Sequence, residues 1–186
     1  MFIGCSINSA FAHVNNDTLS SGFFSGLTHP IFGWDHMAAM IAVGLWGAIL
    51  KKPAIWMLPI AFPAVMSLGA AAGILQIPIA YTEAGIALSC LVLGILVTSF
   101  VKAPIGIAVF IVALFAVFHG YAHGIELPEA VNPMAYAVGF VVGTGLLHLV
   151  GILLGFLTEF ELGKTAIRLS GIGIALIGAY FLFAIQ

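Results

Sequence analysis

The chain has 186 residues, of which 62% are hydrophobic and only 6% are charged, against about 25% charged residues in an average soluble domain. This composition excludes a soluble globular domain and indicates a membrane protein with several spans. Five Lys and Arg residues stand against seven Asp and Glu residues, which excludes the broad basic surface that binding to nucleic acid requires.

The amino-terminal stretch precedes the first long apolar segment. Residues 1–12 are mildly apolar and end in Ala10-Phe11-Ala12, a small-x-small pattern typical of a signal-peptidase site. The stretch contains no basic residue and is short for a signal, which equally favours an ordinary exposed leader. We expect residues 13–29 to form an extracytoplasmic arm and residues 30–186 to form the transmembrane domain.

Six apolar segments follow, separated by charges and prolines. Each is about 19 to 25 residues long, which is enough for a helix to cross a hydrocarbon core about 30 Å thick. The segments do not alternate polar and apolar residues, as strands of a membrane barrel would. We therefore predict an all-α, polytopic bundle of six transmembrane helices. The predicted helices are residues 30–50, 54–75, 83–101, 104–123, 134–158 and 165–185.

The basic residues predict the orientation of these helices, because Lys and Arg stay on the cytoplasmic side of a membrane. All of them lie in, or one turn from, the loops at one end of the predicted bundle. They are Lys51, Lys52, Lys102, Lys164 and Arg168. The amino terminus and the carboxyl terminus are then both expected outside, in a protein that crosses a bacterial-type inner (plasma) membrane several times.

Pairs of glycines four residues apart recur in the second, fourth and fifth predicted helices. Small residues at this spacing let transmembrane helices approach closely. The pairs are Gly69 with Gly73, Gly120 with Gly124, Gly139 with Gly143, and Gly151 with Gly155. They predict a tightly packed bundle and carry no information about a substrate.

The first of two histidine motifs opens the first predicted membrane helix and reads His29-Pro-Ile-Phe-Gly-Trp-Asp35-His36. Proline suits the first turn of a helix and disfavours helical geometry in the residue before it. We therefore expect a helix that begins at Pro30, with His29 at its outer mouth. Asp35 and His36 then lie about two turns deeper and serve as a ligand and the group that orients it.

The second motif reads Phe118-His119-Gly-Tyr-Ala-His123-Gly-Ile-Glu126. His119 and His123 are four residues apart and share one face of the fourth predicted helix, and Glu126 extends that face if the helix continues for another turn. By the predicted orientation, both motifs lie in the outer half of the bundle. Glu83, His148 and an amino-terminal arm carrying His13 are further candidate ligands on or toward that side.

Ionisable groups at membrane depth are costly, so a cluster of them indicates a functional site. Imidazole and carboxylate together suit divalent transition metals. We expect uptake of a divalent transition-metal cation from the outer side, with the cation as cargo and without a resident cofactor or enzymatic step. Because ligation needs neutral imidazoles, binding should weaken as the pH falls through about 6.5. The expected partners are the cation and the lipid bilayer. The sequence does not decide whether the chain also forms a homo-oligomer.

Two other classes of protein remain as alternatives. An intramembrane metal-dependent hydrolase would use three ligands and a carboxylate base, with Glu126 or Asp35 in that role. The sequence shows no recognisable nucleophile or oxyanion donor for it. A membrane electron carrier would bind haem between histidines of facing helices, and a purified protein without a haem spectrum would exclude that class.

The two histidine motifs resemble those of the HupE/UreJ family of nickel and cobalt permeases. In that family a His-Pro-x-x-Gly-x-Asp-His stretch opens the first helix, and a Phe-His-Gly-x-Ala-His-Gly-x-Glu stretch lies in the fourth. The resemblance covers essentially the whole chain, including Glu83 and the Leu-Leu-His148 stretch. It implies six spans and a permease that takes up Ni²⁺ or Co²⁺ or both. By the resemblance, the residues critical for transport are His29, Asp35, His36, Glu83, His119, His123 and Glu126.

Overall fold

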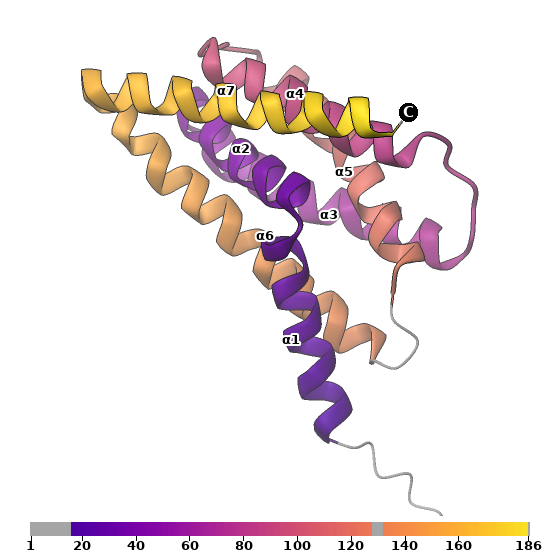
Figure 1. The fold of residues 1–186 in the computed structure, drawn as a ribbon. Coiled ribbons are helices and arrows are strands. Elements are labelled where there is room, and N and C mark those ends of the chain that lie inside the picture. Colours follow the sequence, from indigo (N-terminus) through magenta and orange to yellow (C-terminus); the bar gives the residue numbers. More distant parts are fainter. Residues whose placement is uncertain (1–15, 128–131, 186) are drawn as a thin grey trace, which may run out of the picture.

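The computed structural model describes residues 16–127 and 132–185 (Figure 1). Within these residues the chain forms seven α-helices and one short 3-10 helix, and it contains no strand. The elements are α1 (Asn16–Phe32), α2 (Trp34–Leu50), α3 (Ala54–Ile74), α4 (Thr82–Thr98), α5 (Ile105–Ile125), α6 (Pro133–Gly155), η1 (Phe156–Glu159) and α7 (Glu161–Ala184). The predicted all-helical fold is confirmed for this part of the chain.

Four of these helices, α3, α5, α6 and α7, are long and apolar enough to cross a membrane, with α6 counted together with η1. The consecutive helices α1 and α2 provide a fifth candidate span that is bent by 80°. Helix α4 has 17 residues, which at about 1.5 Å per residue is shorter than a hydrocarbon core of about 30 Å. The chain is a multi-pass membrane protein, and the count of six spans stays a prediction.

The prediction that a helix begins at Pro30 is wrong. Pro30 lies inside α1, three residues before the break at Gly33, and His29 is helical rather than extended. Proline has no N–H and disturbs the helix around it, so it can accompany the end of a helix as well as its start. Residues 16–29, the described part of the expected arm at residues 13–29, are helical and lie in α1, which packs along α6, as Figure 1 shows.

The ends of α3 and α4 follow a common local rule. Gln76 and Phe100 adopt a positive φ of 55° and 51°. In each case the residue and its successor donate backbone hydrogen bonds back to the last helical turn, as from Phe100 N to the Val97 oxygen at 3.1 Å. This is the Schellman arrangement. It ends α4 at Thr98, three residues before the predicted end of that helix.

Helices α3 and α5 are held together by the glycines that the sequence singled out. A Cβ added to Gly120 would lie 1.9 Å from the carbonyl oxygen of Met66, and one added to Gly69 would lie 2.4 Å from that of Val117. Both distances are far below van der Waals contact, so only glycine permits this approach. The backbone of α5, which carries the second histidine motif, is thereby fixed against α3.

The other two glycine pairs hold α6 in the same way against the amino-terminal helices. An added Cβ would lie 2.0 Å from the Phe23 oxygen of α1 at Gly139, and 2.2 Å from the Ile41 oxygen of α2 at Gly151. The predicted close packing of all the paired glycines is confirmed. Helix α6 therefore spans the break between α1 and α2 and fixes both sides of it.

We expect the variant Gly120→Ala to be less stable than the wild type by about 1 to 3 kcal/mol, because the new methyl group overpacks the α3–α5 contact. Thermal unfolding in detergent micelles measures the effect. Gly106→Ala is the matched control, since Gly106 lies in the same helix and an added Cβ there meets nothing within 4 Å. Equal unfolding midpoints for the Gly120 variant and the wild type would refute the packing argument.

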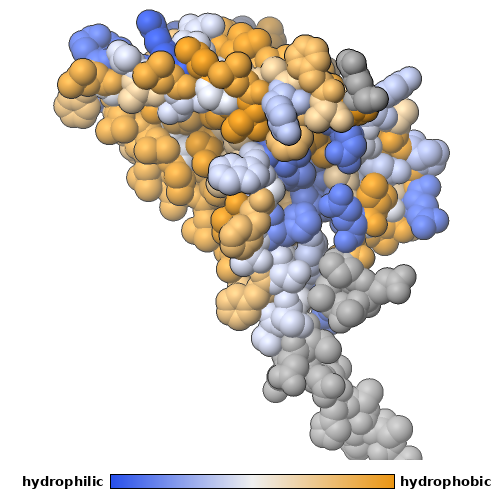
Figure 2. Space-filling model, in the orientation of Figure 1, coloured by the Kyte–Doolittle hydropathy of each residue, from blue (hydrophilic) through white to orange (hydrophobic). Residues whose placement is uncertain are grey.

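The outer surface fits a lipid environment. Many large apolar side chains are exposed, among them Leu68, Phe110 and Phe183. Figure 2 shows hydrophobic residues over most of the visible face, with hydrophilic residues gathered between the bend of α1 and α2 and the end of α5. A polar area inside such a surface is the expected location of a functional site.

Candidate metal centre

The break between α1 and α2 brings the first histidine motif together. His29 lies in the last turn of α1, and Asp35 and His36 lie in the first turn of α2. Between them Gly33 is extended, with φ −80° and ψ 107°, and the axis turns by 80°. The rings of His29 and His36 consequently lie 6.4 Å apart, instead of being separated along one continuous helix.

The second motif meets the first from α5. His119 and His123 lie one turn apart on the same face, as predicted, and Glu126 caps the helix with its backbone N–H bonded to the Ala122 oxygen. The ring of His123 lies 4.8 Å from that of His29 and 4.5 Å from that of His36. The ring of His119 lies 4.8 Å from that of His36. Four imidazoles from three helices thus form one contiguous cluster.

One group in this cluster has the composition of a metal site and a spacing slightly wider than that of bound ligands. Within residues 16–127 and 132–185, one set of three acidic or imidazole side chains places its ligand atoms within 4.8 Å of one another, and it consists of His29, His123 and Glu126. His29 Nε2 and Glu126 Oε2 are 3.8 Å apart. Ligand atoms on one ion, bound at about 2.1 Å, lie about 3 to 4 Å apart. Small rotamer changes would therefore close the group around a cation.

His29, His123 and Glu126, called the triad below, extend from the surface into the bundle. Glu126 is half exposed, His29 is partly buried, and His123 is only 4% exposed. Burial raises the pKa of Glu126 above its usual value, and repulsion from Glu83 and Asp35 adds to this effect, whereas His36 opposes it. A carboxylate whose ionised form is disfavoured by partial burial and by repulsion from other carboxylates is stabilised by a nearby cation. Glu126 is therefore suited to receive a divalent ion at the mouth of the cluster.

Asp35 determines which nitrogen of the His36 ring carries the hydrogen. Its Oδ1 accepts from the His36 backbone N–H and contacts His36 Nδ1, each at 2.8 Å. An ionised carboxylate only accepts, so Nδ1 must donate and the lone pair of a neutral ring resides on Nε2. Among the described residues His36 Nε2 has no hydrogen-bond partner and is buried. This carboxylate–histidine pairing is the one that orients metal ligands in proteins.

Ser89 of α4 determines the tautomer of the His119 ring in a similar way. The Ser89 hydroxyl donates to the Ile86 carbonyl at 2.6 Å and contacts His119 Nε2 at 2.9 Å. Because its single proton is already engaged, Ser89 accepts from Nε2–H, which leaves the lone pair of His119 on Nδ1. His119 is fully buried, and Nδ1 has no partner in the part of the chain that the structure describes.

We expect Ser89→Ala to weaken Ni²⁺ binding to the purified protein by roughly tenfold, the lower end of the effects seen when the orienting partner of a ligand is removed. Without the hydroxyl, His119 loses the contact that sets its tautomer. Isothermal titration calorimetry in detergent measures the change. Ser170→Ala is a suitable control, because the hydroxyl of Ser170 is exposed and bonds to the Ala166 carbonyl of its own helix. Unchanged affinity of the Ser89 variant would show that Ser89 does not position the ring.

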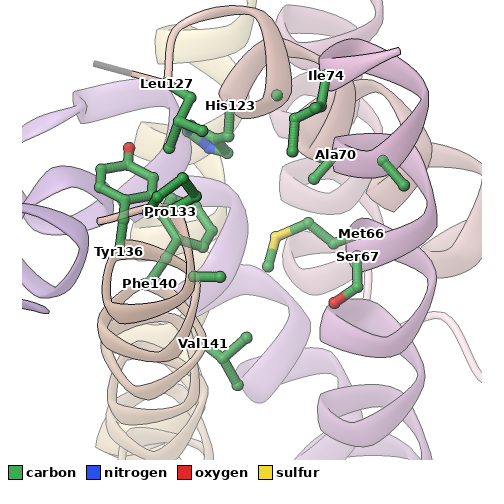
Figure 3. A pocket seen from close by; sticks show the side chains of 14 residues that line it. Met66, Ser67, Ala70, Ile74, His123, Leu127, Pro133, Tyr136, Phe140 and Val141 are labelled. Carbon is green, nitrogen blue, oxygen red and sulfur yellow. The ribbon is translucent and has the colours of Figure 1, made fainter. Parts of the chain in front are cut away.

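Aromatic side chains of α6 close the cluster on one side. The ring of Phe140 lies 4.1 Å from that of His123, and the ring of Tyr136 lies 6.1 Å from that of His29. Beside them a cavity of ≈ 200 Å³ opens between α3, α5 and α6, lined by Met66, His123, Tyr136 and ten or so small and apolar neighbours. Figure 3 shows His123 at the rim of this cavity, near Leu127 and Tyr136.

Two of the remaining candidates, Glu83 and His148, do not belong to the group formed by His29, His123 and Glu126. Glu83 is exposed in the first turn of α4, and its negative charge helps to raise the pKa of Glu126. His148 is buried in α6, with its ring 5.5 Å from that of Phe62. His13 and the leader at residues 1–12 lie outside the described residues. Sequence reasoning missed Ser89, Tyr136 and Phe140, because an isolated serine or aromatic residue in an apolar helix carries no signal of its own.

Cys90, which lies beside Ser89, supports the site indirectly. Its thiol donates to the backbone oxygen of Asp35 at 3.0 Å and thereby ties α4 to the first turn of α2. Cys90 is a free and buried cysteine. It acts as a packing residue that holds the Asp35–His36 pair in place.

Comparison with known proteins gives one consistent result. The model of the family described as HupE / UreJ protein matches residues 2–181 of the chain. The chain is 40% identical over 173 residues to a protein of Rhizobium leguminosarum bv. viciae named Protein HupE, and the match covers 93% of this chain and 91% of that protein. No solved structure shows a significant match to the chain.

Proposed function

This chain belongs to the HupE/UreJ family, and we propose that it is a permease that takes up Ni²⁺ or Co²⁺ through the centre described above. The observation that carries the proposal is the convergence of His29, His123 and Glu126, which come from two helices and offer ligand atoms within 4.8 Å of one another. A set of imidazole and carboxylate ligands inside an apolar bundle is suited to a borderline divalent cation.

The proposed orientation follows from the basic residues. Lys51 and Lys52 lie between α2 and α3, and Lys102 lies between α4 and α5. Arg168 of α7 stacks over the Phe100 ring at 5.2 Å, and its backbone oxygen accepts from Thr98. The basic end of the bundle is placed in the cytoplasm by the positive-inside tendency. The metal centre then opens to the outer side of a bacterial-type plasma membrane, with six crossings and both termini outside.

The proposed driving force is the membrane potential. A potential that is negative inside favours entry of a dication by about 4 to 5 kcal/mol per 100 mV, from about 2.3 kcal/mol per charge. Glu126 attracts the cation, His29 and His123 replace part of its hydration shell, and His36 and His119 accept it deeper in the bundle. Asp35 and Ser89 keep the lone pairs of these last two rings free for ligation.

Selectivity must come from geometry. The stability order of divalent metals predicts that Cu²⁺ binds this ligand set more tightly than Ni²⁺ or Co²⁺, and that Zn²⁺ competes with them. The buried rings of His119 and His123 are packed against Phe62 and Phe140. Such packing limits how many ligands reach the ion at once, and thereby which coordination geometry the site accepts.

Purified protein in liposomes tests the proposal directly. With an entrapped metal-sensitive dye and an inside-negative potential, we expect Ni²⁺ and Co²⁺ to enter faster than Mg²⁺ or Ca²⁺, which prefer oxygen ligands. Protein-free liposomes give the background leak. Entry of Ni²⁺ at the background rate, with correctly folded protein in the membrane, would refute transport.

We expect uptake to decrease as the external pH is lowered through the range of an ordinary imidazole pKa, about 6.5. Protons and the cation compete for the same nitrogen lone pairs, so the bound fraction of metal falls as the proton concentration rises. The raised pKa of Glu126 adds competition from protons at the mouth of the site. The initial rate of Ni²⁺ entry, measured from pH 8 to about pH 5 under a fixed potential, checks the direction. A rate that rises on acidification would contradict it.

A further inference from the structure

A second group of polar atoms lies deeper in the bundle and takes no part in the metal centre. His148 of α6 is 1% exposed, and within the described residues neither of its ring nitrogens has a hydrogen-bond partner. Thr144, one helical turn earlier on the same face, is fully buried, and its hydroxyl is likewise without a partner there. Two such neighbouring groups are costly to keep in an apolar core unless they bind something.

Helix α3 offers this group a free backbone oxygen. Both Pro59 and Pro63 lie inside α3. Since Pro63 has no N–H, the carbonyl of Pro59 lacks the donor that a helix normally provides four residues later. The Pro59 carbonyl is near enough to interact with the His148 ring, although the contact does not have the geometry of a regular hydrogen bond. An imidazole, a hydroxyl and a free carbonyl are thus contributed by two neighbouring helices.

A series of ring contacts connects this group to the metal centre. The ring of Phe62 is fully buried and lies 5.5 Å from the ring of His119 and 5.5 Å from that of His148. His119 in turn contacts His36, and His36 contacts His123. The rings therefore continue from the triad at the surface to His148 in the interior, with Phe62 as the step between the two groups.

We propose that His148, Thr144 and the Pro59 carbonyl form a second binding station for the divalent cation, beyond Phe62 on the route toward the basic end of the bundle. The proposal rests on the transport function proposed above. One nitrogen and two oxygen ligands suit the same borderline cations as the outer centre. The station has no carboxylate, so it holds the ion more weakly than the outer site, which permits release toward the inside.

The competing interpretation is structural. In it, His148 only donates a hydrogen bond to the carbonyl that Pro63 leaves free, as polar side chains do in membrane helices interrupted by proline. Two substitutions separate the interpretations. His148→Asn keeps an N–H donor but is a poor ligand for Ni²⁺, whereas His148→Cys provides a metal ligand but only a weak donor.

Liposome uptake and equilibrium binding of Ni²⁺ are measured together on each variant. We expect His148→Asn to retain tight Ni²⁺ binding at the outer centre while its uptake rate falls by at least about tenfold, an effect of the size seen when metal sites are perturbed. His148→Cys should recover part of the rate and shift the preference toward Zn²⁺. Leu149→Ala is the matched control, since Leu149 is a neighbour of His148 on α6 whose side chain is exposed, and it should transport Ni²⁺ like the wild type.

The binding measurement gives a second criterion that does not depend on transport. A weaker Ni²⁺ equivalent should be present in wild-type protein, retained in His123→Ala and lost in His148→Asn. If His148→Asn takes up Ni²⁺ at the wild-type rate, or loses no Ni²⁺ equivalent, the proposed second station is wrong. If instead the wild type neither binds nor transports Ni²⁺, the proposed function fails as well, so the two failures are distinguishable.

Discussion

Replacing His123 by alanine is expected to reduce Ni²⁺ uptake into liposomes by at least about 100-fold. Removing a group that only orients a metal ligand already lowers metal affinity or activity by about 10- to 100-fold, and this substitution removes a ligand itself. His123 is the ring that contacts both His29 and His36. It also belongs to the triad with Glu126. The substitution therefore removes a ligand from the outer group and interrupts the series of rings that leads inward.

The matched control for this experiment is Leu114→Ala. Leu114 lies on the same helix α5 and its side chain is exposed at the surface, so the truncation leaves the site intact. Folding of both variants is compared by size-exclusion chromatography and thermal unfolding. If folded His123→Ala protein transports Ni²⁺ within about twofold of the control, a difference of less than about 1 kcal/mol, the assignment of His123 is wrong.

The second large effect is expected for Asp35→Asn. Oδ1 of Asp35 accepts from both the backbone and the ring of His36, and the amide side chain of Asn keeps the shape but not the charge. The amide oxygen can still accept from Nδ1–H, but the bond loses its charge assistance, and the amide NH₂ competes for the same position, so the ring of His36 is held less firmly with its Nε2 lone pair free. We expect Ni²⁺ affinity to fall by about 10- to 100-fold, measured by titration of the purified protein.

Glu161→Gln is the matched control for Asp35→Asn, because it makes the same change from carboxylate to amide. Glu161 is an exposed residue that pairs with Lys164 at the start of α7, away from the histidines. The affinity of the Glu161→Gln variant for Ni²⁺ should equal that of the wild type. Equal losses in both variants would indicate an effect of overall charge rather than a specific role of Asp35.

The bundle could be predicted in large part from the sequence, because apolar length and glycine spacing report directly on helix formation and packing. The contacts of Gly69, Gly120, Gly139 and Gly151 with neighbouring backbones were all expected from their spacing. What could not be predicted is the break at Gly33. A proline before an apolar stretch is compatible with the start of one helix or with the end of another, and the difference depends on how α6 packs against both sides.

The candidate site was predictable where chemistry is confined to few residue types. His29, His123 and Glu126 stand out in an apolar chain, and the structure brings them together. Glu83, expected in the same cluster, is exposed and does not belong to the group of His29, His123 and Glu126. Ser89 could not be singled out, because its role depends on a contact between α4 and α5 that follows from tertiary packing rather than from its sequence position.

The most direct test of the account is the coordination of Ni²⁺ in the wild-type protein, measured by X-ray absorption at the nickel edge with one equivalent of metal. We expect a mixed shell of nitrogen and oxygen ligands that includes scattering from the imidazoles of His29 and His123, and a smaller imidazole contribution in His123→Ala. A shell of oxygen ligands alone, or a spectrum that the substitution leaves unchanged, would contradict it.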